Sequence, residues 1–390
     1  LLFIFIIRLL LNTGRRFIYP FAPALSRSLD VPLTAITTII ASSQFTSLLG
    51  LLSGPVADRF GNRVVMRTGL ALLSIGMLLC GLLPQYWVVF AGLVLASFGK
   101  TVFDPAVQSF VGRHVPYARR GRVIGIIETA WAGSTLIGIP ALALIIENIG
   151  LQSSFYVLAG FGAVGWIMIA RILPEDTKTE GDKSKPLRLL PSILSLFQNR
   201  KTAGMLLFGF WISIANDALF VVYGLWLEQS FAVSLVALGF TTVAIGGAEL
   251  LGESVTALFS DRIGLKKTIV ISLCCVSIAY AILPFMGSAL PLAMLGMFFV
   301  FLFFEIVMVT SFSLSTELLP GSRATMMSGF YALSGIGRMI GVLIGGILWQ
   351  FGGITLVAWC ASAFTILGLL SLLWGLQGWK HQDLLRDASQ

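Results

Sequence analysis

Long uninterrupted apolar stretches are the feature that most limits how this chain can fold. Residues 64–83 and 356–376 run near or past the ~18–20 residues with which a helix crosses ~30 Å of hydrocarbon. The charged fraction is only 11%, whereas soluble domains carry about 25% charged residues. Lipid offers no partners to backbone amides, and β-barrels use shorter, alternating strands, so these stretches must be helices. The composition therefore predicts an all-α membrane protein.

The distribution of basic residues indicates the orientation of these helices. Most Lys and Arg residues lie in alternate loops, with Arg59, Arg119 and Lys266 as examples, whereas the intervening loops hold only Arg27. This is the positive-inside pattern, and it predicts that both termini are cytoplasmic. The net charge of +8 therefore reports topology, and we expect no nucleic-acid partner.

Apolar runs separated by polar turns predict twelve transmembrane helices in two sets of six. They lie near residues 1–25, 32–56, 64–83, 86–111, 121–146, 152–173, 202–227, 233–259, 268–287, 290–315, 324–350 and 354–378. We expect an N-terminal six-helix bundle (1–173), a cytoplasmic linker with an interfacial helix (174–199), and a C-terminal six-helix bundle with a cytoplasmic tail (200–390). The sequence does not begin with Met, so a few residues are expected to precede Leu1.

The two halves repeat each other at one nearly constant offset. The loop 58–61 recurs at 261–264, and Pro116 and Arg119 recur as Pro320 and Arg323. Asn12 and Tyr19 likewise recur as Asn216 and Tyr223. Landmarks on three different helix pairs share this register, which indicates a duplicated six-helix unit.

One cytoplasmic loop carries the most specific motif, Gly54-Pro-Val-Ala-Asp58-Arg59-Phe-Gly61-Asn-Arg63. It resembles the loop signature of the major facilitator superfamily: a glycine, three residues, then Asp-Arg-x-Gly with further basic residues. The resemblance implies two pseudo-symmetric six-helix bundles, alternating access and a binding site between the halves. It also implies a cytoplasmic gate, in both copies of the loop, formed by Gly54, Asp58, Arg59, Gly61, Arg63, Asp261, Arg262 and Gly264.

Two departures from the family pattern weaken finer assignments. Ala257 stands where the second copy of the loop would carry its first glycine. The antiporter-type signature of the fifth span is only partly present, since Ile139 separates Gly138 from Pro140. The alternative for the loop is a basic turn that only fixes topology.

Ionisable residues within the predicted spans are the candidate functional residues, because each costs several kcal/mol unless it is paired or faces water. Lys100 and Asp104 stand one helical turn apart and can pair directly. Asp217 and Arg338 come out at similar depth and can meet across helices. The predicted substrate pathway comprises Arg15, Arg16, Tyr19, Lys100, Asp104, Asp217 and Arg338.

A second group of acidic residues is predicted to carry protons. At ~1.5 Å per residue, Glu249 and Glu305 are both predicted to lie ~18 Å from the nearest charged residue at the cytoplasmic end of their spans. No cation is assigned to either. Two charged carboxylates at one depth repel each other, so they can take up and release protons. Glu253 lies one turn below Glu249 and can relay protons. The predicted proton-coupling residues are Glu128, Glu249, Glu253 and Glu305.

Each of these groups has a structural alternative. The pairs Lys100–Asp104 and Asp217–Arg338 can serve only to fix helix packing. Arg15 and Arg16 can bind carboxylates of the protein itself, and Glu253 can be a gating or structural contact.

These features together predict a proton-coupled transporter of a small organic solute, with a slight preference for efflux. The alternatives are uptake of an organic anion, motivated by the arginines within the spans, and a lipid flippase with the same fold. No enzyme is expected, because the only histidines, His114 and His381, lie outside the spans and no nucleophile or metal motif is seen. We expect no cofactor, and partners limited to the lipid bilayer, the substrate and protons. The chain is expected to be a multi-pass monomer of the inner membrane.

Overall fold

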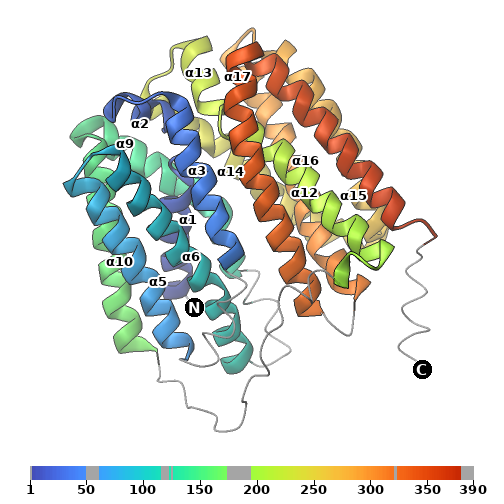
Figure 1. The fold of residues 1–390 in the computed structure, drawn as a ribbon, viewed down its shortest axis with the longest axis horizontal. Coiled ribbons are helices and arrows are strands. Elements are labelled where there is room, and N and C mark those ends of the chain that lie inside the picture. Colours follow the sequence, from blue (N-terminus) through green and yellow to red (C-terminus); the bar gives the residue numbers. More distant parts are fainter. Residues whose placement is uncertain are drawn as a thin grey trace.

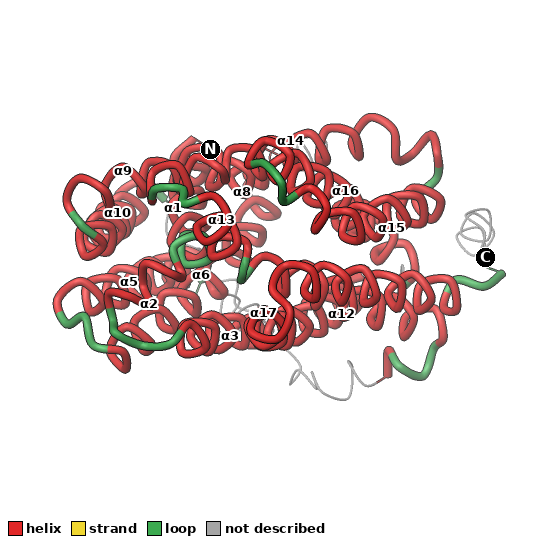
Figure 2. The backbone as a smooth tube through the Cα atoms, turned by 90° about the horizontal axis from the view of Figure 1, so that it is seen from above, coloured by secondary structure: helices red, strands yellow, loops and turns green. Residues whose placement is uncertain are grey.

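The chain folds into two groups of long helices, shown side by side in Figures 1 and 2. The structure is a computed structural model that describes residues 2–49, 61–115, 123, 126–173, 195–319 and 323–378, and within these ranges no strand occurs. Three of the predicted gate residues (Gly54, Asp58 and Arg59), most of the linker and the end of the tail lie outside the described residues.

The first group of helices is formed by residues up to 172. Its elements are α1 (Leu2–Arg16), α2 (Ala22–Ser28), α3 (Leu33–Leu49), α5 (Asn62–Leu82), α6 (Tyr86–His114), α8 (Ala130–Gly133), the π-helical turn η2 (Ser134–Gly138), α9 (Ile139–Ile149) and α10 (Leu151–Ile172).

The second group begins at residue 200. Its elements are α12 (Arg200–Phe220), α13 (Tyr223–Phe231), α14 (Leu235–Ile263), α15 (Leu265–Ile282), the 3₁₀ turn η3 (Leu283–Met286), α16 (Leu290–Leu318) and α17 (Arg323–Gly375).

The described helices fit the twelve predicted spans. Nine helical segments among the described residues are long and apolar enough to cross a bilayer. One of them, α17, is interrupted at Gly352 and Gly353, where φ of Gly353 is 56°. Glycine adopts this left-handed conformation without strain, so α17 provides two spans. The shorter apolar helix α3 and the continuous α1–α2 segment account for the remaining two.

Glycines bring helices within a half into close contact. A Cβ atom placed on Gly341 of α17 would lie 2.6 Å from the carbonyl oxygen of Ile214 on α12, and one on Gly69 of α5 would lie 2.6 Å from that of Gly99 on α6. Small residues let helix backbones approach closely where lipid supplies no hydrophobic drive for association. The bundles are therefore packed backbone to backbone at these crossings.

The two halves are joined on the side of the molecule where α2 and α13 lie, at the top of Figure 1, opposite the N- and C-terminal ends. Arg27 of α2 pairs with Glu228 of α13 at 2.6 Å. Deeper in, Thr242 of α14 donates to the carbonyl of Thr135 in η2 at 2.8 Å, and α3 packs along α17. The conformation is therefore closed on this side.

Candidate functional site

A buried ion pair crosses between the halves at the centre of the site. Arg16, the last residue of α1, donates to Glu249 of α14 through both terminal nitrogens, at 2.6 and 3.1 Å. Each side chain is only 3% exposed. Thr135 donates to the same carboxylate at 2.9 Å, and the guanidinium lies 4.2 Å from the ring centroid of Trp131. This bidentate geometry is the strong form of an Arg–carboxylate contact.

The prediction that Glu249 has no cation partner is therefore wrong. Depth along separate helices gave Glu249 the same level as Glu305, but it did not give the direction in which each carboxylate points. Arg16 was assigned to the substrate pathway, with a carboxylate of the protein itself as the alternative partner. The structure shows the alternative, because the guanidinium binds a carboxylate of the opposite half.

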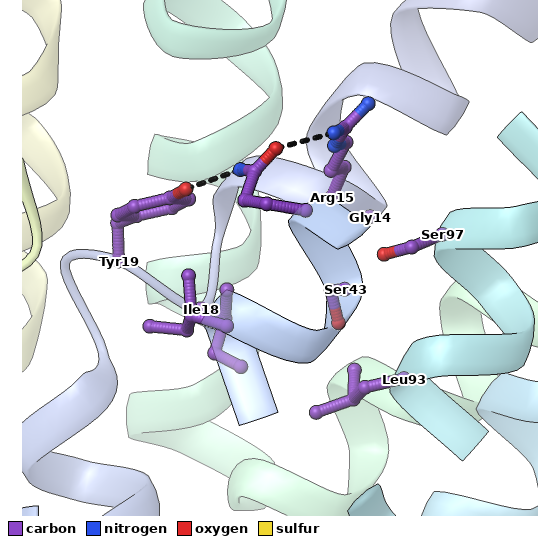
Figure 3. Close-up of a pocket in the computed structure, with 9 residues that line it drawn as sticks. Gly14, Arg15, Ile18, Tyr19, Ser43, Leu93 and Ser97 are labelled. Carbon is purple, nitrogen blue, oxygen red and sulfur yellow. Dashed lines mark hydrogen bonds between the residues drawn. The ribbon is translucent and has the colours of Figure 1, made fainter. Parts of the chain in front are cut away.

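A second contact between the halves runs from the turn between α1 and α2 to α12. The Tyr19 hydroxyl donates to Asp217 Oδ1 at 3.1 Å and accepts from Gln44 Nε2 at 2.5 Å. Arg15 in turn donates to Gln44 Oε1 at 2.5 Å and to Ser47 at 2.9 Å. Figure 3 shows this chain of polar groups from Arg15 to Tyr19, beside a small cavity.

The cavity next to these groups has a volume of about 10 Å³. That is about the space needed by one water molecule, so it does not hold an organic solute in this conformation. Its walls include Gly14, Ser43, Leu93 and Ser97 of the N-terminal half.

The predicted contact of Asp217 with Arg338 is not formed. The two residues lie near enough to attract each other, but they make no ion pair within 4.0 Å. Arg338 has no hydrogen bond or ion pair to any described residue, and Arg15 contacts only neutral groups. These two guanidiniums, one from each half, are close enough to repel each other. Both arginines thus reach the interface without a carboxylate in contact.

A third cluster lies wholly within the N-terminal half. Arg8 of α1 donates to both carboxylate oxygens of Glu128, at 2.6 and 2.7 Å, and its Nε lies 3.3 Å from Asp104. The predicted pairing of Lys100 with Asp104 is confirmed. Arg8 therefore bridges Asp104 and Glu128, which was predicted to be a proton-coupling residue.

Arg8 was missed by sequence reasoning, although a signal was present. It stands one helical turn before Asn12 and about two turns before Arg15, on the same face of the first span. Its closeness to the start of the chain obscured its depth in the membrane.

The remaining carboxylates gather below the central ion pair. Glu305 of α16 is buried, with 9% exposure. A Cβ atom on Gly252 of α14 would lie 2.9 Å from the Cβ of Glu305. Glu305 has no ion pair or hydrogen bond to the part of the chain that the structure describes. Glu253 is half-buried and lies near Glu249. The structure therefore brings Glu249, Glu253 and Glu305 into one acidic group.

The described part of the predicted gate has a glycine with positive φ in each half. Gly61 precedes α5 with φ of 89°, and Gly264 separates α14 from α15 with φ of 95°. The positive φ thus recurs at the same place in each half. Arg63 donates to the carbonyl of Ala170, which ties α5 to α10. Arg262 is exposed, and of the side chain of Asp261 nothing is described.

Comparison with known proteins identifies the family. A family model described as Major Facilitator Superfamily matches residues 4–216 and 205–383. The chain belongs to the major facilitator superfamily. This superfamily transporter is 25% identical, over 79% of each chain, to an uncharacterized transporter, YceJ, of Bacillus subtilis (strain 168). It is also 25% identical, over 70% of each chain, to the class G tetracycline resistance protein of Vibrio anguillarum.

Solved structures of superfamily transporters show the same fold. A bacterial homologue of the human lysosomal transporter Spinster, in an inward-facing and unoccupied conformation, matches with a TM-score of 0.73 at 15% identity, over 99% of this chain and 97% of that one. A point mutant of the nucleoside transporter NupG matches with a TM-score of 0.76 at 14% identity, over 97% of this chain and 100% of that one.

Proposed function

We propose that this superfamily transporter is a proton-coupled exporter of a small organic solute. In this proposal residues 1–173 rock against residues 200–378, both termini are in the cytoplasm, and the membrane is a bacterial inner membrane. The side closed by α2 and α13 then faces outward. The observation that carries the proposal is the buried Arg16–Glu249 pair, because it joins the two halves through a group that a proton can neutralise.

Protonation of Glu249 would remove the negative half of this ion pair. Arg16 would keep its charge in a buried position, which is costly without a carboxylate. Proton uptake by Glu249 therefore weakens the contact between the halves and favours opening of the outer side. Proton release towards the cytoplasm restores the pair.

This coupling supports export over symport. After a symporter has delivered its cargo, the empty and deprotonated carrier must reopen outward, and the Arg16–Glu249 pair would oppose that step. An exporter needs the opposite behaviour, because an empty carrier that has lost its proton must wait for solute from the cytoplasm. The resistance-protein names of relatives such as the class G tetracycline resistance protein support the same direction.

Glu305 is the second member of the proposed proton path. A charged carboxylate at this depth is costly when no cation contacts it, and proton uptake removes that cost. Glu253, half-buried on α14, links Glu305 and Glu249 to the cytoplasmic side. Protons would thus pass through the acidic group of Glu249, Glu253 and Glu305.

Proteoliposomes test this proposal with tetracycline and ethidium as probe solutes. We expect probe transport to accelerate when the proton gradient drives protons in the opposite direction to the probe. The variants E249Q and E305Q should lose that acceleration. Transport that ignores the gradient and is unchanged in both variants would refute proton coupling. T316V, which replaces the hydroxyl of Thr316 on α16, outside the acidic group, is the control and should behave as the parent.

Uptake of an organic anion is the second candidate function, and a specific observation favours it. Arg15 and Arg338 come from opposite halves, and neither contacts a carboxylate of a described residue. Two such guanidiniums can bind a carboxylate or phosphate in a bidentate manner. Inward, gradient-driven accumulation of benzoate that R15Q and R338Q abolish would support uptake over export.

A further inference from the structure

A groove lies away from the transport site, on the surface of the N-terminal half between α5 and α10. Its volume is about 290 Å³, and it is lined by Val64, Arg67, Thr68, Ala71, Leu72 and Trp166. The groove lies near the first residues of α5 and the last residues of α10, which form the lower end of the molecule in Figure 1. It opens to the surroundings, since Val64 is 50% and Trp166 is 37% exposed.

Arg67 is held in this groove without a negative partner. Its guanidinium carbon lies 4.2 Å from the ring centroid of Trp166. Among the residues that the structure describes, its buried Nε has no hydrogen-bond acceptor and its guanidinium has no ion pair. The N–H donors of an Arg lie in the plane of its guanidinium. Stacking on an aromatic ring therefore leaves them free to bind an anion through two hydrogen bonds. One turn earlier, Arg63 is already engaged by the carbonyl of Ala170.

The position of Arg67 corresponds to the headgroup region of a bilayer. It stands five residues inside the start of α5 at Asn62, or about 7.5 Å along the helix axis at ~1.5 Å per residue. Trp side chains are enriched at this interface. Basic pockets between transmembrane helices on the cytoplasmic side are known to receive anionic headgroups.

An apolar strip continues from the groove along α5 to the far end of this helix. Ala71 is followed on the same face of α5 by Ile75, Leu78 and Leu82, which are 51%, 44% and 57% exposed. An acyl chain lying along this strip would contact apolar atoms over its length, whereas a free phosphate ion would use only Arg67.

We propose that the groove between α5 and α10 binds an anionic phospholipid of the surrounding bilayer, with the phosphate on Arg67 and an acyl chain along the apolar strip. Trp166 holds the guanidinium in place, and the lipid phosphate accepts from its terminal nitrogens. This site is independent of solute and proton transport.

The test measures lipid binding to the full chain in dodecyl maltoside micelles. Phosphatidylglycerol and phosphatidylcholine with identical acyl chains are compared by lipid retention in native mass spectrometry and by the rise in Tm. We expect phosphatidylglycerol to be retained and to raise Tm more than phosphatidylcholine. In R67Q we expect binding of phosphatidylglycerol to weaken at least tenfold, to the level of phosphatidylcholine.

Two further variants separate this site from general charge effects. T68F leaves Arg67 in place but fills the groove from an exposed position, and it should also lose phosphatidylglycerol. R262Q removes an exposed cation at the corresponding end of α14 and should bind as the parent. Unchanged binding in R67Q and T68F, equal loss in R262Q, or equal stabilisation by inorganic phosphate alone would overturn the proposal.

Discussion

Replacing Glu249 with glutamine tests the role of the buried ion pair most directly. The substitution keeps the shape of the side chain and removes its charge, which mimics a permanently protonated Glu249. In the closed conformation Arg16 would then be buried at 2% exposure without a counter-charge. We therefore expect the conformational equilibrium to shift towards opening of the side closed by α2 and α13.

The size of this shift follows from the burial of both partners. Removing one partner of a buried ion pair costs about 3–5 kcal/mol. Since the amide oxygen introduced by E249Q can still accept one N–H from Arg16, the lower limit of about 3 kcal/mol applies. At 1.4 kcal/mol per factor of ten, the ratio of open to closed molecules rises about a hundredfold.

Cysteine labelling at Thr242 measures this ratio. Thr242 is 0% exposed and lies in the contact between α14 and η2, so T242C is protected while the halves are joined. In a background without the native cysteines, the labelling rate by a membrane-impermeant maleimide reports opening. We expect T242C/E249Q to react about a hundredfold faster than T242C, on the 1.4 kcal/mol per tenfold scale.

Two controls decide whether the reasoning is right. R16Q/E249Q leaves no uncompensated charge, so its labelling rate should lie closer to that of T242C than either single variant does. R27Q breaks the more exposed Arg27–Glu228 pair, with Arg27 58% exposed, and such pairs contribute only about 0.2–1 kcal/mol. Equal rates in T242C and T242C/E249Q, or a larger effect of R27Q, would refute the assigned role of Glu249.

Three other residues, Glu305, Arg8 and Gly341, lead to further predictions. E305Q should abolish the dependence of transport on the proton gradient, measured in proteoliposomes, while unfolding less readily than E249Q, because Glu305 has no ion pair with the described residues to lose. R8Q leaves Asp104 and the 40% exposed Glu128 without their shared guanidinium, so chemical denaturation should show a loss of about 1–3 kcal/mol, between the values of exposed and buried pairs; a loss below about 1 kcal/mol would contradict a buried role. G341A should be destabilised by about 1–3 kcal/mol through overpacking, whereas G247A, with nothing within 4 Å of the added Cβ, should unfold as the parent.

The fold was predictable because its signals are local or repeated. Apolar runs of bilayer length indicate helices without any knowledge of their neighbours. The duplicated loop then indicates two halves, and its glycines at 61 and 264 both adopt a positive φ. The pairing of Lys100 with Asp104 was predictable for the same reason, since residues four apart share a helix face.

The contacts between helices were not predictable in this way. Arg16 and Glu249 are separated by 233 positions, and Arg8 and Glu128 by 120. Residue counting gives the depth of each side chain in the membrane, but the rotation of each helix decides which residues of equal depth face each other. That rotation is set by packing, such as the contact of Gly341 with the backbone of Ile214.

The first span takes part in two sets of ion pairs, one within its own half and one between the halves. Its lower part holds Arg8, which binds Asp104 and Glu128 of its own half, and its upper part holds Arg16, which binds Glu249 of the other half. Rocking of the halves must break the second set of contacts and can keep the first. Substitutions at Arg8 should therefore change the free energy of unfolding more than the balance between conformations, and substitutions at Arg16 should change that balance. Substitutions at these two arginines, eight residues apart on one helix, should thus separate effects on the free energy of unfolding from effects on transport.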